Sequence, residues 1–335
     1  MVDVSADVRP ARRKSVASER PDRSAVLNGL KRSDTIFRIL THAAAIAVLG
    51  ILGSVFVSLF FGSLPALYAF GPGFLIGQSW NPVTDQFGAL APIWGTLVTA
   101  IVAMMIAVPV GLGIAIFLTE LCPMPLRRPI GIAIELLAGV PSIIYGIWGL
   151  FVFAPFLQQY LQPGLISLFG HIPGLSTIFA GPPLGIGVFT AALILAIMVL
   201  PFMTAVCRDV FDTVPPVLKE SAYGLGCTTW EVMRNVVIPY TRVGVIGGGM
   251  LALGRALGET MAVTFVVGNA QRFSASILQP GTTISATIAN EFAEATGGLY
   301  QSSMIALGLI LFILTFFVLA GARLLLRSLE KKAGN

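Results

Sequence analysis

An arginine and a glutamate four residues apart interrupt a long apolar stretch of the chain. Arg255 and Glu259 are the only charged residues between positions 243 and 268. A charge in the middle of a lipid bilayer costs about 3 kcal/mol unless it is paired or hydrated. On a helix, residues at i and i+4 share a face, so the two side chains can neutralise each other. The pair therefore indicates either an internal lock between helices or a polar position on a path across a membrane.

The chemistry of the pair favours the second interpretation. Arginine presents a planar guanidinium that can donate two parallel hydrogen bonds to an oxyanion. Glutamate would compensate the charge of the arginine when no anion is bound. It would also keep an anion from binding too tightly. The same helical face carries small residues, which suit either tight helix packing or the wall of a narrow aqueous path. These small residues are Gly244, Gly248, Ala252 and Ala262.

A polar segment ahead of this stretch has the pattern of two short helices. Pro215 and Pro216 can begin a helix, and Gly224 and Gly226 can end it. A second short helix is expected to follow and to stop before Pro239. Apolar residues recur at helical spacing in the first helix and predict one apolar face. They are Leu218, Ala222 and Leu225.

The composition requires a lipid environment for these segments. The chain has 335 residues, of which 56% are hydrophobic and 11% charged, with a mean hydropathy of +0.86. Soluble domains carry about 25% charged residues. This chain has too little polar surface to cover a water-exposed globule, so we interpret it as an integral membrane protein.

Six apolar stretches have the length of about 20 residues that a membrane-crossing helix needs. They are residues 42–64, 92–118, 130–154, 184–207, 243–268 and 301–325. Residues 155–183 are also apolar but contain five prolines, so we expect a loop there with at most a short interfacial helix. The prediction is an all-α integral membrane domain of six transmembrane helices over residues 39–330.

The distribution of lysine and arginine orients these helices. With the N-terminus inside the cell, 19 of the 21 basic residues fall on cytoplasmic segments, one falls on an outer loop and Arg255 lies within a span. This asymmetry predicts that both termini are cytoplasmic. Residues 208–242 then form the longest cytoplasmic loop. Residues 1–38 are expected to be a disordered basic cytoplasmic tail ahead of the first span, rather than an arm that binds nucleic acid.

Several other kinds of site are excluded or disfavoured. Cys122, Cys207 and Cys227 form no CxxC motif, and His42 and His171 are isolated, so we expect no metal site and no cofactor. No lysine follows a glycine, so the phosphate-binding loop of an ATPase is absent from the sequence. If transport is driven by ATP, the ATPase must be a separate chain.

Two acidic residues lie at the inner ends of predicted spans. Glu120 is at the end of the second span, where a charge costs little. Glu135 is near the start of the third, and we expect Arg127 or Arg128 to be its partner.

The cytoplasmic loop resembles the EAA loop of type I ABC importer permeases. The residues that carry this resemblance are Glu220, Ser221, Ala222, Gly226 and Val236-Val237-Ile238-Pro239. Their spacing agrees with the family pattern, although Ser221 replaces an alanine and two aliphatic residues are exchanged. The resemblance implies that Glu220, Ser221, Ala222, Gly226 and Pro239 belong to a coupling loop that docks on the ATPase subunit.

The run Gly-Arg-Ala-Leu-Gly-Glu-Thr-Met-Ala at 254–262 is similar to a signature of the C-type permeases of bacterial phosphate ABC importers. It implies that Arg255 and Glu259 lie on the path of phosphate. The implied partners are a cytoplasmic ATP-binding subunit, a second related permease, an extracytoplasmic phosphate-binding protein and membrane lipid. The implied location is the bacterial inner membrane, and the implied mechanism is alternating access.

Three alternatives stay open at this point. The chain could be a permease for another oxyanion, such as molybdate, sulfate or phosphonate, which the 254–262 run disfavours. A secondary transporter or channel would have no use for an EAA-type loop. A membrane-embedded enzyme is disfavoured because no ligand cluster or nucleophile–base pair is visible at membrane depth.

Overall fold

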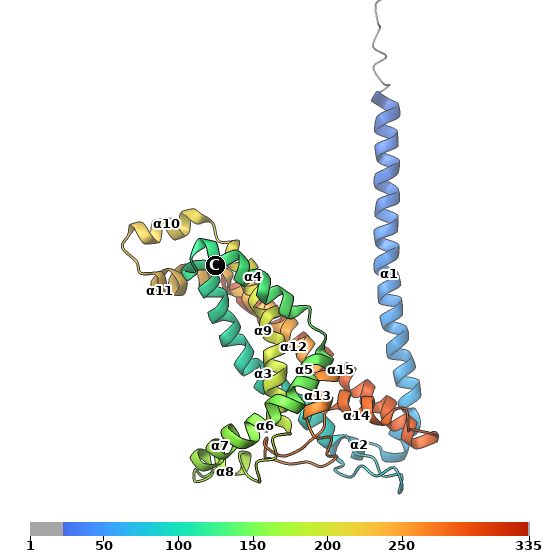
Figure 1. Ribbon diagram of the computed structural model, residues 1–335. Coiled ribbons are helices and arrows are strands. Elements are labelled where there is room, and N and C mark those ends of the chain that lie inside the picture. Colours follow the sequence, from blue (N-terminus) through green and yellow to red (C-terminus); the bar gives the residue numbers. More distant parts are fainter. Residues whose placement is uncertain (1–22, 334–335) are drawn as a thin grey trace, which may run out of the picture. The chain divides into compact units, whose positions relative to one another are not determined.

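The structure is a computed structural model that describes residues 23–333, and every regular element in that range is a helix (Figure 1). An isolated antiparallel bridge between Asn81 and Gln86 belongs to no strand. The predicted all-α fold is confirmed for this part of the chain.

Six helical stretches among the described residues are long and apolar enough to cross a membrane, which confirms the predicted number. They are Ser33–Phe70, Leu90–Leu121, Ser142–Phe169, Val188–Asp212, Thr229–Leu257 and Gly298–Leu324. The first and second cover the predicted stretches, the fourth and sixth overlap theirs with bounds that differ by at most five residues, and the third and fifth are shifted by more than ten residues.

The first long helix, α1 (Arg23–Phe70), runs through two parts of the chain that are each described by themselves. One part extends to Val55 and the other begins at Phe56. Residues 1–22, most of the predicted basic tail, lie outside the described residues, and residues 23–38 are the start of α1. The predicted boundary at residue 38 stays a prediction.

The third predicted span is divided by a break at Gly139–Pro141. Helix α4 (Met124–Ala138) ends at Gly139, and α5 (Ser142–Trp148) begins after Pro141. The break has a local cause, because the residue before a proline is disfavoured in the helical conformation. The single span predicted at 130–154 is therefore wrong, and the crossing helix starts at Ser142.

Four π-helical segments occur among the described residues, and each ends two residues before a proline. They are η1 (Phe117–Leu121), η2 (Gly149–Phe153), η3 (Leu157–Leu161) and η4 (Met233–Val237). A wider π turn accommodates a residue that lacks an N–H and whose ring crowds the preceding turn.

These π turns explain two differences from the sequence prediction. After η2 and η3 the helix continues through Pro155 and Pro163 as α6 (Ala154–Phe156) and α7 (Gln162–Phe169), so the predicted loop is helical over 155–169. After η4 it continues through Pro239 as α12 (Ile238–Leu257). The expected stop before Pro239 is therefore wrong.

Helix α9 (Val188–Asp212) lies at the centre of residues 56–333. It packs against α3 (Leu90–Ile116), α4, α12 and α13 (Met261–Val266). Small buried residues such as Ala191 and Ala196 allow close approach, and Gly111 of α3 lies against Met203. Large apolar side chains on the surrounding helices are exposed, as a lipid environment requires.

Short helices lie at the two ends of this central group. Helices α10 (Pro216–Gly224) and α11 (Thr229–Val232) lie at one end, and α7, α8 (Leu175–Ile178) and α14 (Ile284–Glu291) at the other (Figure 1). The remaining elements are α2 (Gly73–Ile76) and α15 (Gly298–Ala333). The predicted cytoplasmic and outer loops thus occupy opposite ends.

Candidate functional site

Arg255 and Glu259 lie on either side of a helix end rather than on one continuous helix. Arg255 is in the last turn of α12, which ends at Leu257, and α13 begins at Met261. The carboxylate of Glu259 accepts the main-chain N–H of Ala262 over 3.3 Å and so satisfies a free donor in the first turn of α13. The unbroken span predicted at 243–268 is wrong for this reason.

The break also separates the two charges. In the described part of the chain no ion pair joins Arg255 and Glu259, so the expected mutual neutralisation is not observed. Arg255 is exposed and Glu259 is half-buried. An exposed guanidinium within a membrane helix must face water or another protein rather than lipid. The arrangement leaves Arg255 available to an anion.

The small residues of α12 have a packing role over most of its length. A Cβ on Gly244 would lie 2.6 Å from Val210 of α9, and one on Gly248 would lie 2.6 Å from Val206. Ala252 is fully buried. Of the two alternatives that the sequence left open, close packing against α9 is the one observed for these residues.

The cytoplasmic loop has the predicted pair of short helices. Helix α10 begins directly after Pro215 and ends at Gly224, and Gly226 adopts a φ of +86°, which favours glycine. The N–H of Cys227 donates to the carbonyl of Ala222 over 3.2 Å and closes the turn. Pro239, by contrast, lies near the start of α12, where the loop joins the fifth span.

The apolar face predicted for the first helix of this loop is only partly buried. Ala222 is buried, but Leu218 and Leu225 are exposed. Glu220 and Ser221 also point outward, as do several large side chains. The large apolar residues of the loop that are exposed are Val217, Leu218, Tyr223, Leu225, Trp230 and Tyr240. Exposed apolar surface of this kind is typical of sites that contact another protein or a membrane.

Sequence reasoning missed the cap that begins α11. Thr228 Oγ1 accepts the N–H of Glu231, and the Glu231 carboxylate accepts the N–H of Thr228 over 2.8 Å. This reciprocal capping box has a sequence signal, a threonine followed three residues later by a glutamate. It fixes the second half of the loop.

Ion pairs that join distant segments were also missed or misassigned. Lys219 of α10 contacts Glu120 of η1 at 2.6 Å. Glu135 of α4 contacts Arg208 of α9 at 2.7 Å, and not Arg127 or Arg128 as expected. Arg127 instead contacts Asp212 at 3.0 Å. These ion pairs connect α10 to the end of the second span and connect α4, which follows that span, to α9.

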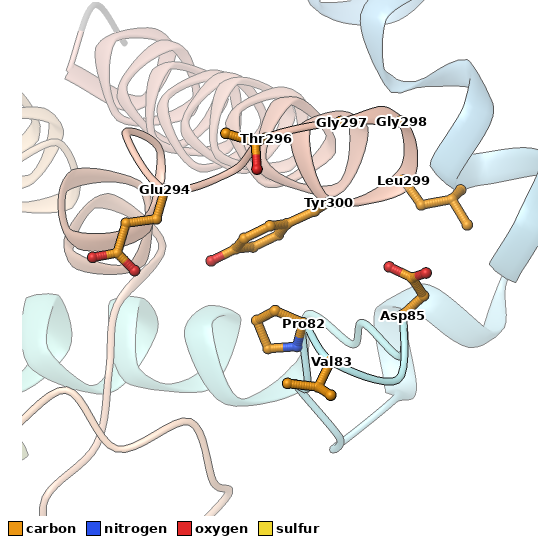
Figure 2. Close-up of a pocket in the computed structure, with 9 residues that line it drawn as sticks. All are labelled: Pro82, Val83, Asp85, Glu294, Thr296, Gly297, Gly298, Leu299 and Tyr300. Carbon is orange, nitrogen blue, oxygen red and sulfur yellow. The ribbon is translucent and has the colours of Figure 1, made fainter.

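The opposite end of the molecule contains an acidic pocket of about 560 Å³. Its walls are the loop before α3 and the loop that leads into α15, and Figure 2 shows the Tyr300 ring between the two walls. Asp85 and Glu294 line it. Beside it, the Glu291 carboxylate accepts hydrogen bonds from Trp80 Nε1 at 2.6 Å and from the Tyr300 hydroxyl at 3.0 Å.

Comparison with known proteins identifies the family. Residues 107–331 match the family described as "Binding-protein-dependent transport system inner membrane component". The chain is 66% identical over 315 residues to the phosphate transport system permease protein PstC of Mesorhizobium japonicum, covering 94% of this chain and 96% of that protein. The chain belongs to the PstC-type permeases of this family. A second relative is the PstC protein of Pasteurella multocida, to which the permease is 57% identical, with coverage of 90% and 94%.

Solved structures agree on the fold of the permease. A crystal structure of a bacterial alginate ABC transporter, in complex with an alginate pentasaccharide-bound periplasmic protein, contains a similar chain. The TM-score is 0.58 at 16% identity, covering 88% of the permease and 94% of that chain. The permease is therefore a multi-pass membrane component with an ABC importer permease fold. Within residues 23–333 it has no cluster of three or more metal-ligating side chains.

Proposed function

We propose that the permease forms part of the translocation path of an ATP-driven importer of inorganic phosphate. The observation that carries this proposal is the 66% identity, over 94% of the chain, to a phosphate transport permease. The exposed Arg255 beside a break in the fifth span supports it, because a guanidinium suits a phosphate oxyanion.

Arg255 and Glu259 have different roles in this proposal. Arg255 binds the phosphate anion by paired hydrogen bonds and by charge. Glu259 lies just beyond the helix end, where its carboxylate opposes tight retention of the anion. In an alternating-access cycle, the path around the break opens to one side of the membrane and then to the other.

The energy for this cycle comes from a separate ATP-binding subunit on the cytoplasmic side. The loop 208–242 docks on that subunit through the surface of α10. Glu220 and Ser221 face outward for this contact, whereas Ala222 packs α10 against the permease. Gly226 permits the turn between the two helices, and Pro239 joins the loop to the fifth span.

The proposal also includes the orientation of the permease in the membrane and two further protein partners. The excess of lysine and arginine on the α10 side supports cytoplasmic termini in a bacterial inner membrane. A second related permease completes the path, and an extracytoplasmic phosphate-binding protein delivers phosphate at the opposite end. Lipid covers the exposed apolar helices.

Uptake of labelled phosphate by vesicles that contain the full importer tests the proposal. We expect Arg255→Gln to abolish uptake, and Arg255→Lys to keep a fraction of it because an ammonium lacks the bidentate geometry. Arg323→Gln, which removes an exposed charge from α15, is the matched control and should retain uptake. Unchanged uptake by assembled Arg255→Gln importer would remove Arg255 from the path. Stronger competition by molybdate or sulfate than by unlabelled phosphate would refute phosphate as the substrate.

A further inference from the structure

The contact between Lys219 and Glu120 joins the docking helix to the second membrane span. The Lys219 ammonium lies 2.6 Å from the Glu120 carboxylate, and 99 residues separate them in sequence. Only 19% of the Lys219 side chain and 9% of the Glu120 side chain are exposed. The pair is thus largely withdrawn from solvent, where a charge that loses its partner is costly.

Helix α10 has few other attachments to the permease. Ala222 is its one buried residue, and its large apolar side chains face outward. Besides the Lys219 contact, α10 packs against α11 and η4 and is joined to the chain at its two ends.

Glu120 lies where movement of α10 can be passed on to the membrane helices. It belongs to η1, which directly continues α3. Helix α3 packs along both α9 and α12, and α12 carries Arg255 in its last turn. Displacement of α10 would consequently be transmitted through Glu120 to α3, and from α3 to the helix that holds Arg255.

We propose that Lys219 and Glu120 are positioning residues that couple movement of α10 to the membrane helices. The ion pair makes the docking helix and α3 move as one body during the transport cycle. This inference rests on the proposed function, because it requires that a nucleotide-driven partner moves α10.

A second ion pair on the same side of the molecule provides a matched control. Arg127 and Asp212 join α4 to α9 at 3.0 Å, but their side chains are 34% and 51% exposed. Exposed pairs contribute little, and this one does not involve α10. Reversing its charges should therefore leave coupling unchanged.

The test compares phosphate uptake with ATP hydrolysis in reconstituted full importer. Lys219→Glu and Glu120→Lys each place two like charges in contact, and we expect each to lower the phosphate taken up per ATP hydrolysed by about tenfold. The double variant Lys219→Glu/Glu120→Lys restores the pair in reverse and should return the ratio to within about twofold of wild type. The control double variant Arg127→Asp/Asp212→Arg should keep the wild-type ratio.

The outcomes separate this inference from the proposed function. If the wild-type importer hydrolyses ATP but takes up no phosphate, the proposed function is wrong. If wild-type importer transports and the single variants keep its ratio, or if the double variant stays as defective as the single ones, the coupling role is wrong. If a single variant does not co-purify with the ATP-binding subunit, the coupling role is judged from the double variant alone, by its ratio of phosphate taken up to ATP hydrolysed.

Discussion

Gly95 of α3 lies directly against the main-chain carbonyl of Thr282, with no space for a side chain between them. Next to this contact, Thr96 Oγ1 accepts the N–H of Ile284 over 2.9 Å. Two backbones that are far apart in sequence are thereby held together at the start of α14. The contact is possible only because residue 95 has no Cβ.

Substituting Gly95 with alanine should destabilise the permease. A Cβ there would overlap the Thr282 oxygen, which is backbone and cannot rotate away. We expect Gly95→Ala to lower the free energy of unfolding by about 1–3 kcal/mol. Gly113→Ala is the matched control, because Gly113 is also on α3 and has no neighbouring atom within 4 Å. Thermal unfolding of the detergent-solubilised protein measures both, and an equal loss in the two variants would contradict the packing account.

The packing of α12 on α9 predicts that one substitution lowers stability and that a second substitution restores part of it. A Cβ on Gly248 would lie 2.6 Å from the Val206 side chain, so Gly248→Ala should lower the unfolding temperature. Adding Val206→Ala removes the obstructing methyl groups and should recover part of the loss. Gly249→Ala, at a position without neighbours, should be neutral. If Gly248 lined a water-filled path instead, the alanine would change transport without changing stability.

The number of spans could be predicted from sequence because the bilayer thickness fixes the length of an apolar helix. The residues at which each helix begins and ends could not be predicted, because proline has two opposite effects in this chain. Before Pro141 the helix stops, whereas before Pro155 and Pro163 a π turn lets it continue. The proline alone does not decide the outcome, because the residue before it is disfavoured in the helical conformation at all three positions.

The candidate site shows a similar limit. Arg255 and Glu259 could be found because a charge inside an apolar stretch is costly and therefore informative. Their relative placement could not, because the helix ends between them. The partners of Lys219 and Glu135 were likewise hidden, since Glu120 and Arg208 come next to them only through helix packing.

The carboxylate of Glu291 connects three segments, and this predicts an order of stability among variants of Glu291. It accepts hydrogen bonds from Trp80, Tyr300 and Gln271. Glu291→Ala leaves these donors unpaired and should lower the free energy of unfolding by about 1–3 kcal/mol for each that stays buried. Glu291→Gln should cost less, because the buried Oε1 of Gln271 has no partner and can accept from the new amide after the Gln271 amide rotates.

Glu294→Ala is the control for this series. Glu294 lines the neighbouring pocket, and its backbone forms hydrogen bonds with the backbones of Glu291 and Thr296. Chemical denaturation of the three variants gives the order, and a Glu291→Gln variant less stable than Glu291→Ala would show that the donors are not held by this carboxylate.

The docking surface of the cytoplasmic loop yields a prediction about affinity. Leu225 is 86% exposed at the end of α10. If the ATP-binding subunit covers it, Leu225→Ser removes apolar area from the interface and should weaken association on the order of tenfold. Val83→Ser is the matched control, because Val83 is 92% exposed and lies at the opposite end of the molecule. Titration of labelled ATP-binding subunit against solubilised permease complex measures both affinities. Equal binding by the two variants would mean that the end of α10 lies outside the interface, and the proposed docking surface would then have to be moved to another part of the loop.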